Sequence, residues 1–278
     1  MRIIGCDGKI AIFKYTVFSL VFVCSAALLS FYAGSFSTGK TEKVPTAVEL
    51  SSEKETNPAP EAETKEETKE EGTEDTVQNG RLLMIDPGHG GEDGGAVSDS
   101  GILEKDLNLV FSDDLAHLCL MFGVPYKMTR EDDSLLYGKY GELEDYTGKK
   151  KSYDLRNRLK YSRDSGATLL VSVHMNKFSD QGVKGLQVYH STLSENEKAL
   201  AASIHAFVSK HLQRDNNRVA KAANSSIYLL NKSEIPAILI EFGFLSNPAE
   251  CSLLTNYSYS ASLTGTVFVP ILEYFVRS

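Results

Sequence analysis

Polar residues that could carry chemistry stand at the ends of several apolar segments of this 278-residue chain. In a sheet of parallel strands, residues just beyond the carboxyl ends of the strands gather at one edge, where ligands bind. The sequence places there Asp86, His89, His174, Asn176 and Glu241, with Glu104 opening the helix after the first strand. We therefore expect these side chains to form the candidate site.

Glu241 is the only charged residue in the apolar segment 237–244, Ala-Ile-Leu-Ile-Glu-Phe-Gly-Phe. An unpaired buried carboxylate is costly, so this residue requires a metal, another cation or a proton beside it. A structural ion pair with an arginine is the alternative interpretation. His174 ends a similar apolar segment, where a hydrogen-bonded core histidine is the alternative. His89 lies among glycines in the turn 87–91, and glycines let the backbone approach a ligand closely.

Taken together, these residues contain the donor set of a catalytic zinc site. Two neutral imidazoles and one carboxylate commonly bind Zn²⁺ and leave its fourth position open for water. His89 and His174 supply the imidazoles, and either Glu104 or Glu241 supplies the carboxylate. The remaining glutamate would then be the general base.

The elements that must position these residues alternate between strand and helix. Short apolar segments bounded by turn residues predict strands at 81–86, 125–129, 168–174, 185–190, 227–230 and 237–244. Apolar stripes and capping residues predict helices at about 104–122, 154–165, 194–208 and 261–276, and a further one beginning at Asn247. Pro270 is expected to kink or interrupt the last helix. Nearly continuous apolar strands separated by helices predict an α/β fold whose sheet is covered on both faces.

The charge of the chain is concentrated in one segment. The net charge is −8, and residues 41–76 alone contain twelve acidic and four basic residues. The remaining residues are therefore balanced, and the sequence does not indicate a nucleic-acid-binding protein. Only four cysteines are present, which excludes a disulfide-based scaffold.

The N-terminal region predicts a membrane anchor and a stalk. Residues 15–34 contain no charge, which matches the ~20 residues needed to span a bilayer. The basic residues before this segment place residues 1–14 in the cytoplasm and the rest of the chain outside. A signal peptide cleaved near Ser25-Ala26-Ala27 is the alternative. Residues 35–80 predict a disordered acidic linker, so the domain is expected at 81–278.

Five segments carry a resemblance to a known family. They are Ile-Asp-Pro-Gly-His-Gly-Gly (85–91), Glu-Lys-Asp-Leu (104–107), Thr-Arg-Glu (129–131), Ser-Val-His-Met-Asn (172–176) and Ile-Glu-Phe-Gly-Phe-Leu-Ser-Asn-Pro (240–248). In order and spacing, they resemble the amidase type 3 family, the zinc-dependent N-acetylmuramoyl-L-alanine amidases of bacterial cell walls. The resemblance implies a three-layer α/β/α sandwich around a six-stranded mixed sheet.

The resemblance also implies a role for individual residues. His89, Glu104 and His174 would bind zinc, and Glu241 would be the catalytic acid/base. Asn176 and Arg130 match positions near the family's site, with no firm role. The substrate would be peptidoglycan, cleaved between N-acetylmuramic acid and L-alanine.

The likeness is nearest to the branch of the family that acts on spore peptidoglycan. It implies a contribution to muramic-δ-lactam formation in spore cortex, and an activating accessory protein. Residues 132–152 form an insertion that could border the substrate groove. The alternatives are a catalytically silent wall-binding protein of the same fold and a zinc carboxypeptidase acting on wall peptides.

Overall fold

The computed structural model describes residues 80–136 and 149–277. The predicted cytoplasmic segment 1–14, the anchor 15–34 and nearly all of the linker 35–80 lie outside these ranges, as does most of the insertion 132–152. Within the two ranges, no helix is both long enough and apolar enough to cross a bilayer.

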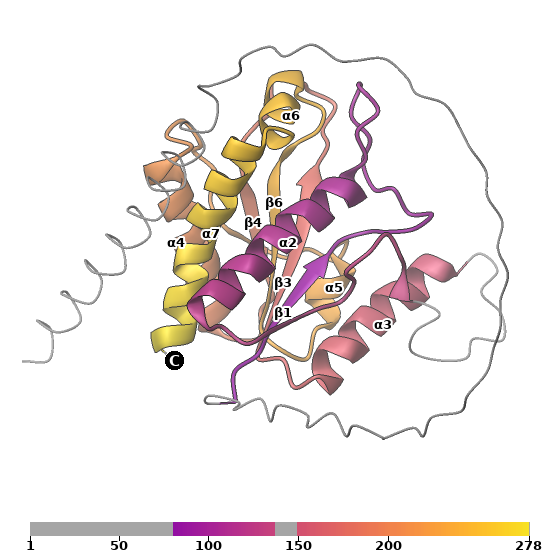
Figure 1. Ribbon diagram of the computed structural model, residues 1–278, viewed down its shortest axis with the longest axis vertical. Helices are drawn as coiled ribbons and strands as arrows, with labels where there is room; N and C mark the ends of the chain where they lie inside the picture. The colour runs from indigo at the N-terminus through magenta and orange to yellow at the C-terminus, as the bar shows by residue number, and fades with distance from the viewer. Residues whose placement is uncertain (1–79, 137–148, 278) are drawn as a thin grey trace, which may run out of the picture. The chain divides into compact units, whose positions relative to one another are not determined.

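A mixed six-stranded sheet forms the centre of the domain (Figure 1). The strand order is β2-β1-β3-β6-β4-β5. Strands β2, β1, β3 and β6 run parallel, β4 is antiparallel to β6, and β5 is parallel to β4. The strands are β1 (Leu83–Pro87), β2 (Tyr126–Met128), β3 (Leu169–Asn176), β4 (Gln187–His190), β5 (Lys221–Ala222) and β6 (Ala237–Phe244). The four parallel strands bring their carboxyl ends to one edge of the sheet.

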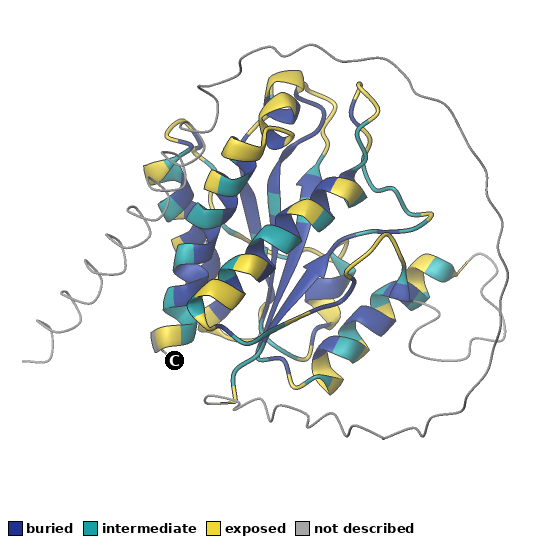
Figure 2. Cartoon of the chain, in the orientation of Figure 1, coloured by how far each residue is buried: buried dark blue, intermediate teal, exposed yellow. Residues whose placement is uncertain are grey.

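Helices pack on both faces of this sheet. They are α2 (Glu104–Phe122), α3 (Lys150–Asp164), α4 (Glu195–His211), α5 (Tyr228–Lys232), α6 (Pro248–Leu254) and α7 (Tyr257–Arg277). Phe111 of α2 packs on Phe242 of β6, with ring centroids 4.7 Å apart. Leu239, three residues earlier and therefore on the opposite face, packs in a core cluster with Leu229 and Leu230 of α5. Figure 2 shows the strands buried between helices whose outer surfaces are exposed. The predicted three-layer arrangement is thus observed.

One predicted strand is wrong. Residues 228–230 belong to helix α5, with Ile227 directly before it, and the sixth strand is instead the two-residue β5. The Asn224 side chain accepts hydrogen bonds from the amide and hydroxyl of Ser226, and this turn leads directly into the helix. A four-residue apolar segment fits a buried helix as well as a strand, because it is too short to show a period.

Two helices begin earlier than the sequence predicts. Helix α3 begins at Lys150 rather than Asp154, and α7 begins at Tyr257 rather than Ala261. Helix α7 also continues through Pro270 rather than ending there.

A buried ion pair joins the end of β1 to helix α3. Arg158 Nη1 lies 2.7 Å from Asp86 Oδ1, and both side chains are only 2% exposed. Thr129, directly after β2, donates its hydroxyl to Oδ1, and Ser172 of β3 donates to Oδ2. Burial alone would raise the pKa of Asp86, but the guanidinium and the two hydroxyls hold it below its ordinary value. One ionised carboxylate therefore connects three strand segments with a helix.

Arg158 extends this network to the loop after β1. Its guanidinium also bonds Asp154 Oδ2 at 2.7 Å and donates to the carbonyl oxygens of Pro87 and His89 at 2.7 and 2.6 Å. The backbone on both sides of Gly88 is thereby fixed to α3.

We expect Arg158→Met to destabilise the domain by about 3–5 kcal/mol, because it leaves Asp86 as an unpaired buried charge. Urea unfolding of the metal-free protein measures this loss. Arg163→Met is the matched control, since Arg163 lies on the same helix but forms exposed ion pairs with Asp164 and Glu234. Its effect should be much smaller. Equal effects of the two substitutions would contradict a central role for the buried pair.

Candidate metal centre

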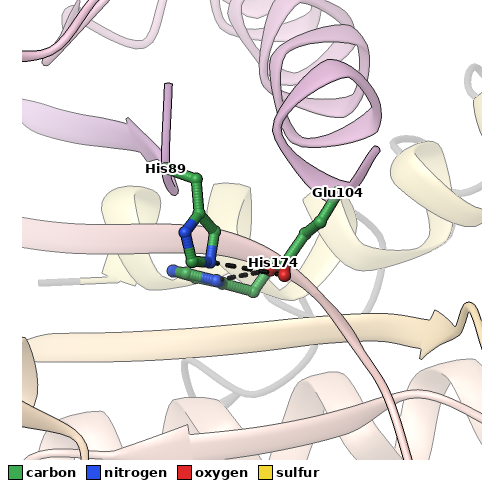
Figure 3. A group of neighbouring side chains, drawn as sticks. All are labelled: His89, Glu104 and His174. Atoms are coloured by element: carbon green, nitrogen blue, oxygen red, sulfur yellow. Dashed lines mark hydrogen bonds and ion pairs between the residues drawn. The ribbon is translucent and has the colours of Figure 1, made fainter. Parts of the chain in front are cut away.

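Three of the sequence-predicted residues meet at the carboxyl edge of the sheet. His89 lies in the loop after β1, Glu104 is the first residue of α2, and His174 lies in β3 (Figure 3). One ligand atom from each residue lies within 4.8 Å of the others. Glu104 is central: its Oε1 lies 2.8 Å from His174 Nδ1, and its Oε2 lies 3.3 Å from His89 Nε2. The two imidazole rings meet edge to face.

Glycines make room for this convergence. A Cβ atom at Gly88 would lie 2.3 Å from the His174 ring, and one at Gly95 would lie 2.6 Å from Glu104 Oε2. His89 itself has a φ of +62°, a left-handed conformation that is uncommon outside glycine. Such a conformation persists only where the surroundings impose it, and here Arg158 holds the His89 carbonyl.

Glu104 is fixed as an ionised ligand. The backbone amide of Ala96 donates to its Oε2 at 2.7 Å, and that of Met175 donates to its Oε1 at 3.1 Å. Burial alone would raise the pKa of Glu104, but the adjacent imidazoles of His174 and His89 hold it well below its usual range. The residue therefore offers a carboxylate, not a carboxylic acid, to any cation at this position.

The electrostatic potential at the cluster favours a cation. Burial would lower the pKa of His89, but the carboxylates of Asp93 and Glu104 raise it to about 9. A position that binds a proton this strongly also attracts a metal ion, which would displace that proton.

The donor set also fits zinc by its geometry. Ligands ~2.1 Å from a tetrahedral Zn²⁺ lie ~3.4 Å from one another. One ligand atom from each of the three residues lies within 4.8 Å of the others, so small side-chain rotations would bring them to this spacing. Two imidazoles and one carboxylate leave a fourth position for water or substrate.

Glu241 lies beside this cluster without belonging to it. It pairs in register with His174 across β3 and β6. Within the described ranges, its buried Oε2 has no hydrogen-bond partner, and no arginine pairs with it. Burial raises the pKa of Glu241 to about 7, with the Glu104 charge adding to the effect and the two histidines opposing it. The geometry thus places Glu104, and not Glu241, between the two imidazoles, and burial leaves Glu241 able to exchange a proton near neutral pH.

Three further candidates have other partners. Asp86 lies outside the cluster, in the ion pair with Arg158. Asn176 lies at the end of β3, where its Oδ1 accepts a hydrogen bond from the Lys177 amide at 2.8 Å. Arg130 is buried and holds the loop after β1.

The Arg130 guanidinium joins the loop after β1 to helix α2. It donates to the carbonyl oxygens of Pro87, Gly88 and Lys105 at 2.9, 3.0 and 2.8 Å. These contacts hold the loop that carries His89 against the first turn of the helix that carries Glu104. Arg130 therefore positions the candidate ligands.

Two residues of the site, Arg158 and Asp93, were not predicted from the sequence. Asp93 Oδ2 lies 2.9 Å from His89 Nδ1. The sequence signal for Asp93 was its position four residues after His89, between Gly90-Gly91 and Gly94-Gly95. Arg158 gave no comparable signal, because it is one of several cations in the polar helix α3.

Comparisons with known proteins agree with this geometry. Residues 83–272 match the family model Amidase_3, described as N-acetylmuramoyl-L-alanine amidase. The germination-specific N-acetylmuramoyl-L-alanine amidase of Bacillus subtilis (strain 168) is 34% identical over 202 residues, which cover 72% of this chain and 81% of that protein. The probable cell wall amidase LytH of Staphylococcus aureus is 28% identical over 70% of this chain and 59% of its own.

Solved structures show the same fold. The CwlD amidase from Clostridioides difficile, in complex with the GerS lipoprotein, matches with a TM-score of 0.65 and 34% identity, over 71% of this chain and 100% of that one. The N-acetylmuramoyl-L-alanine amidase AmiC2 of Nostoc punctiforme matches with a TM-score of 0.58 and 29% identity, over 70% of this chain and 97% of that one.

We expect Gly95→Ala to weaken zinc binding at least about tenfold, because its Cβ would displace Glu104 Oε2 and the His89 ring. Gly101→Ala is the matched control, since Gly101 also has a positive φ but has open space around its Cα. Both substitutions should cost about 1 kcal/mol of stability through backbone strain. Competition with a chromogenic chelator measures the zinc affinity. Equal affinities of the two variants would show that the site does not depend on this close approach.

Proposed function

The chain belongs to the N-acetylmuramoyl-L-alanine amidase family, and we propose that it performs the family's reaction with Zn²⁺ held by His89, Glu104 and His174. The substrate is peptidoglycan, and the bond cleaved joins N-acetylmuramic acid to the L-alanine of the stem peptide. The observation that carries the proposal is the position of Glu241, a carboxylate with an unpartnered buried oxygen beside a cluster that fits zinc.

Zinc in this site would polarise the scissile carbonyl and make water more acidic. The chain's own residues are arranged to receive the metal ion. Glu104 stays ionised and fixed by two backbone amides, and the glycines allow both histidines to approach it. The ligands are in place before substrate binds, so little reorganisation accompanies the reaction.

Glu241 acts as the proton carrier. Its carboxylate takes a proton from the attacking water, whose oxygen bonds to the lactyl carbonyl carbon. As the carbon–nitrogen bond breaks, Glu241 gives that proton to the nitrogen, and the stem peptide leaves with a free amine on its L-alanine. The high pKa of Glu241 supports both steps, because a group that titrates near the working pH can accept and return a proton.

We propose that the catalytic domain lies outside the cytoplasmic membrane, because peptidoglycan lies there. Residues 15–34 would serve as an anchor with residues 1–14 in the cytoplasm, or as a signal that is cleaved. The uncharged 20-residue segment and the basic residues before it support this orientation.

We also propose that the protein acts on spore cortex, where it would contribute to muramic-δ-lactam formation. The 34% identity to a germination-specific amidase supports this assignment. An activating accessory protein is part of the proposal, because the CwlD amidase was solved in complex with a lipoprotein.

We expect Glu241→Gln to keep zinc and lose roughly 10²–10⁴-fold of the activity, because the amide has nearly the same shape but cannot carry the proton. Mass spectrometry of digested peptidoglycan measures the products, which are peptide-free muramic acid and stem peptides with a free L-alanine amine. Glu234→Gln, which alters an exposed glutamate paired with Arg163, is the control.

Other products would identify other functions. Release of single terminal amino acids from wall peptides would indicate a carboxypeptidase. Wild-type protein that sediments with the wall without cleaving it would indicate a binding protein. Full activity of Glu241→Gln would overturn the role of Glu241.

A further inference from the structure

The His89 ring lies between two carboxylates. Its Nε2 lies 3.3 Å from Glu104 Oε2, inside the ligand cluster, and its Nδ1 lies 2.9 Å from Asp93 Oδ2, away from the cluster. The Nδ1 contact has the distance of a hydrogen bond but not its alignment, so a small rotation of the imidazole ring would complete it. The two nitrogens of a histidine differ in role, since a proton on one leaves the lone pair of the other free for a metal. A carboxylate acceptor at Nδ1 therefore selects the tautomer whose Nε2 can bind a metal.

Asp93 is itself held in place by its loop. Its backbone amide and carbonyl both pair with those of Gly90 at 3.0 Å, which closes the loop around His89. Its Oδ1 accepts from the Gly95 amide at 3.4 Å, so the carboxyl group has one oxygen tied to the loop and the other directed at the imidazole. Rotation of this carboxyl group would break both contacts.

The first turn of α3 adds a further contact. Lys151 Nζ lies 3.2 Å from Asp93 Oδ2, the same oxygen that meets His89. The lysine and the imidazole therefore contact the same carboxylate oxygen of Asp93. His89 is thus fixed at its carbonyl by Arg158 and at its ring by Asp93.

We propose that Asp93 is the positioning residue of the metal centre, which accepts the Nδ1 hydrogen of His89 and so aims Nε2 at the zinc ion. The inference rests on the proposed zinc site and extends it by one residue. Carboxylate partners of this kind fix the orientation of metal-binding histidines and raise their basicity, and their removal typically weakens metal binding 10–100-fold.

The experiment measures zinc affinity of the full-length protein by competition with a chromogenic chelator. Asp93→Ala should bind zinc about 10–100-fold more weakly than wild type. Asp93→Asn should lose less, because its amide oxygen can still accept the Nδ1 hydrogen. Glu92→Ala is the matched control, since Glu92 is the preceding carboxylate, also pairs with a lysine of α3, and lies in the same loop. Its zinc affinity should equal that of wild type.

Two further measurements separate positioning from general stability. In the zinc-loaded wild type, ¹⁵N NMR of the histidine side chains should show His89 protonated at Nδ1, and this signal should shift in Asp93→Ala. Thermal unfolding of the metal-free variants should show that Asp93→Ala and Glu92→Ala retain the fold. Should Asp93→Ala fail to fold, Asp93→Asn decides the question by the same readouts.

The outcomes distinguish this inference from the proposed function. Wild-type zinc affinity in Asp93→Ala, or equal weakening in Glu92→Ala, would overturn the role of Asp93 and leave the zinc site intact. A wild-type protein that binds no zinc would overturn both.

Discussion

The buried pair of Asp86 and Arg158 is the interaction on which the site depends. A carboxylate and a guanidinium, each 2% exposed, remain stable in the interior only because hydrogen bonds use nearly all of their polar atoms. Two of the acceptors of Arg158 are the carbonyl oxygens of Pro87 and His89. These hydrogen bonds offset part of the cost of burying the charge, and they also fix the loop that follows β1. The left-handed backbone of His89 follows from this constraint. A structural ion pair therefore sets the backbone conformation of the first candidate ligand, His89.

The two glutamates of the site show how the surroundings assign chemical roles. Glu104 and Glu241 have the same carboxyl group and lie near the same two histidines. Glu104 receives two backbone amides and remains ionised, whereas Glu241 lies in an apolar strand and has a pKa raised to about 7. One can therefore hold a cation and the other can carry a proton. Pairs of titratable groups whose surroundings separate their pKa values in this way are characteristic of acid–base catalysis.

Sequence patterns could predict the site residues whose type is unusual for the residues around them. A lone charge in an apolar strand indicated Glu241, and an imidazole among glycines indicated His89. From the residues alone, either Glu104 or Glu241 could be the third ligand, and the family resemblance implied Glu104. In three dimensions, Glu104 is the carboxylate that lies between the imidazoles. Asp93 and Arg158 were not predicted, because a charged residue in a polar loop or helix is usually solvent-exposed and the sequence does not show its partners. The strand predicted at 227–230 failed because four apolar residues carry no period.

The ligands come from three separate elements, but the contacts that place them are largely independent of a metal. Arg158 and Arg130 hold backbone carbonyls, and the core packs around the central strands β1, β3 and β6, whose side chains are almost fully buried. In small zinc domains, by contrast, the metal supplies most of the folding free energy. Here the scaffold is large enough to form without a metal, so a metal ion would enter a site already shaped for it. Such a site can leave one coordination position for substrate, because the fold does not need that position filled.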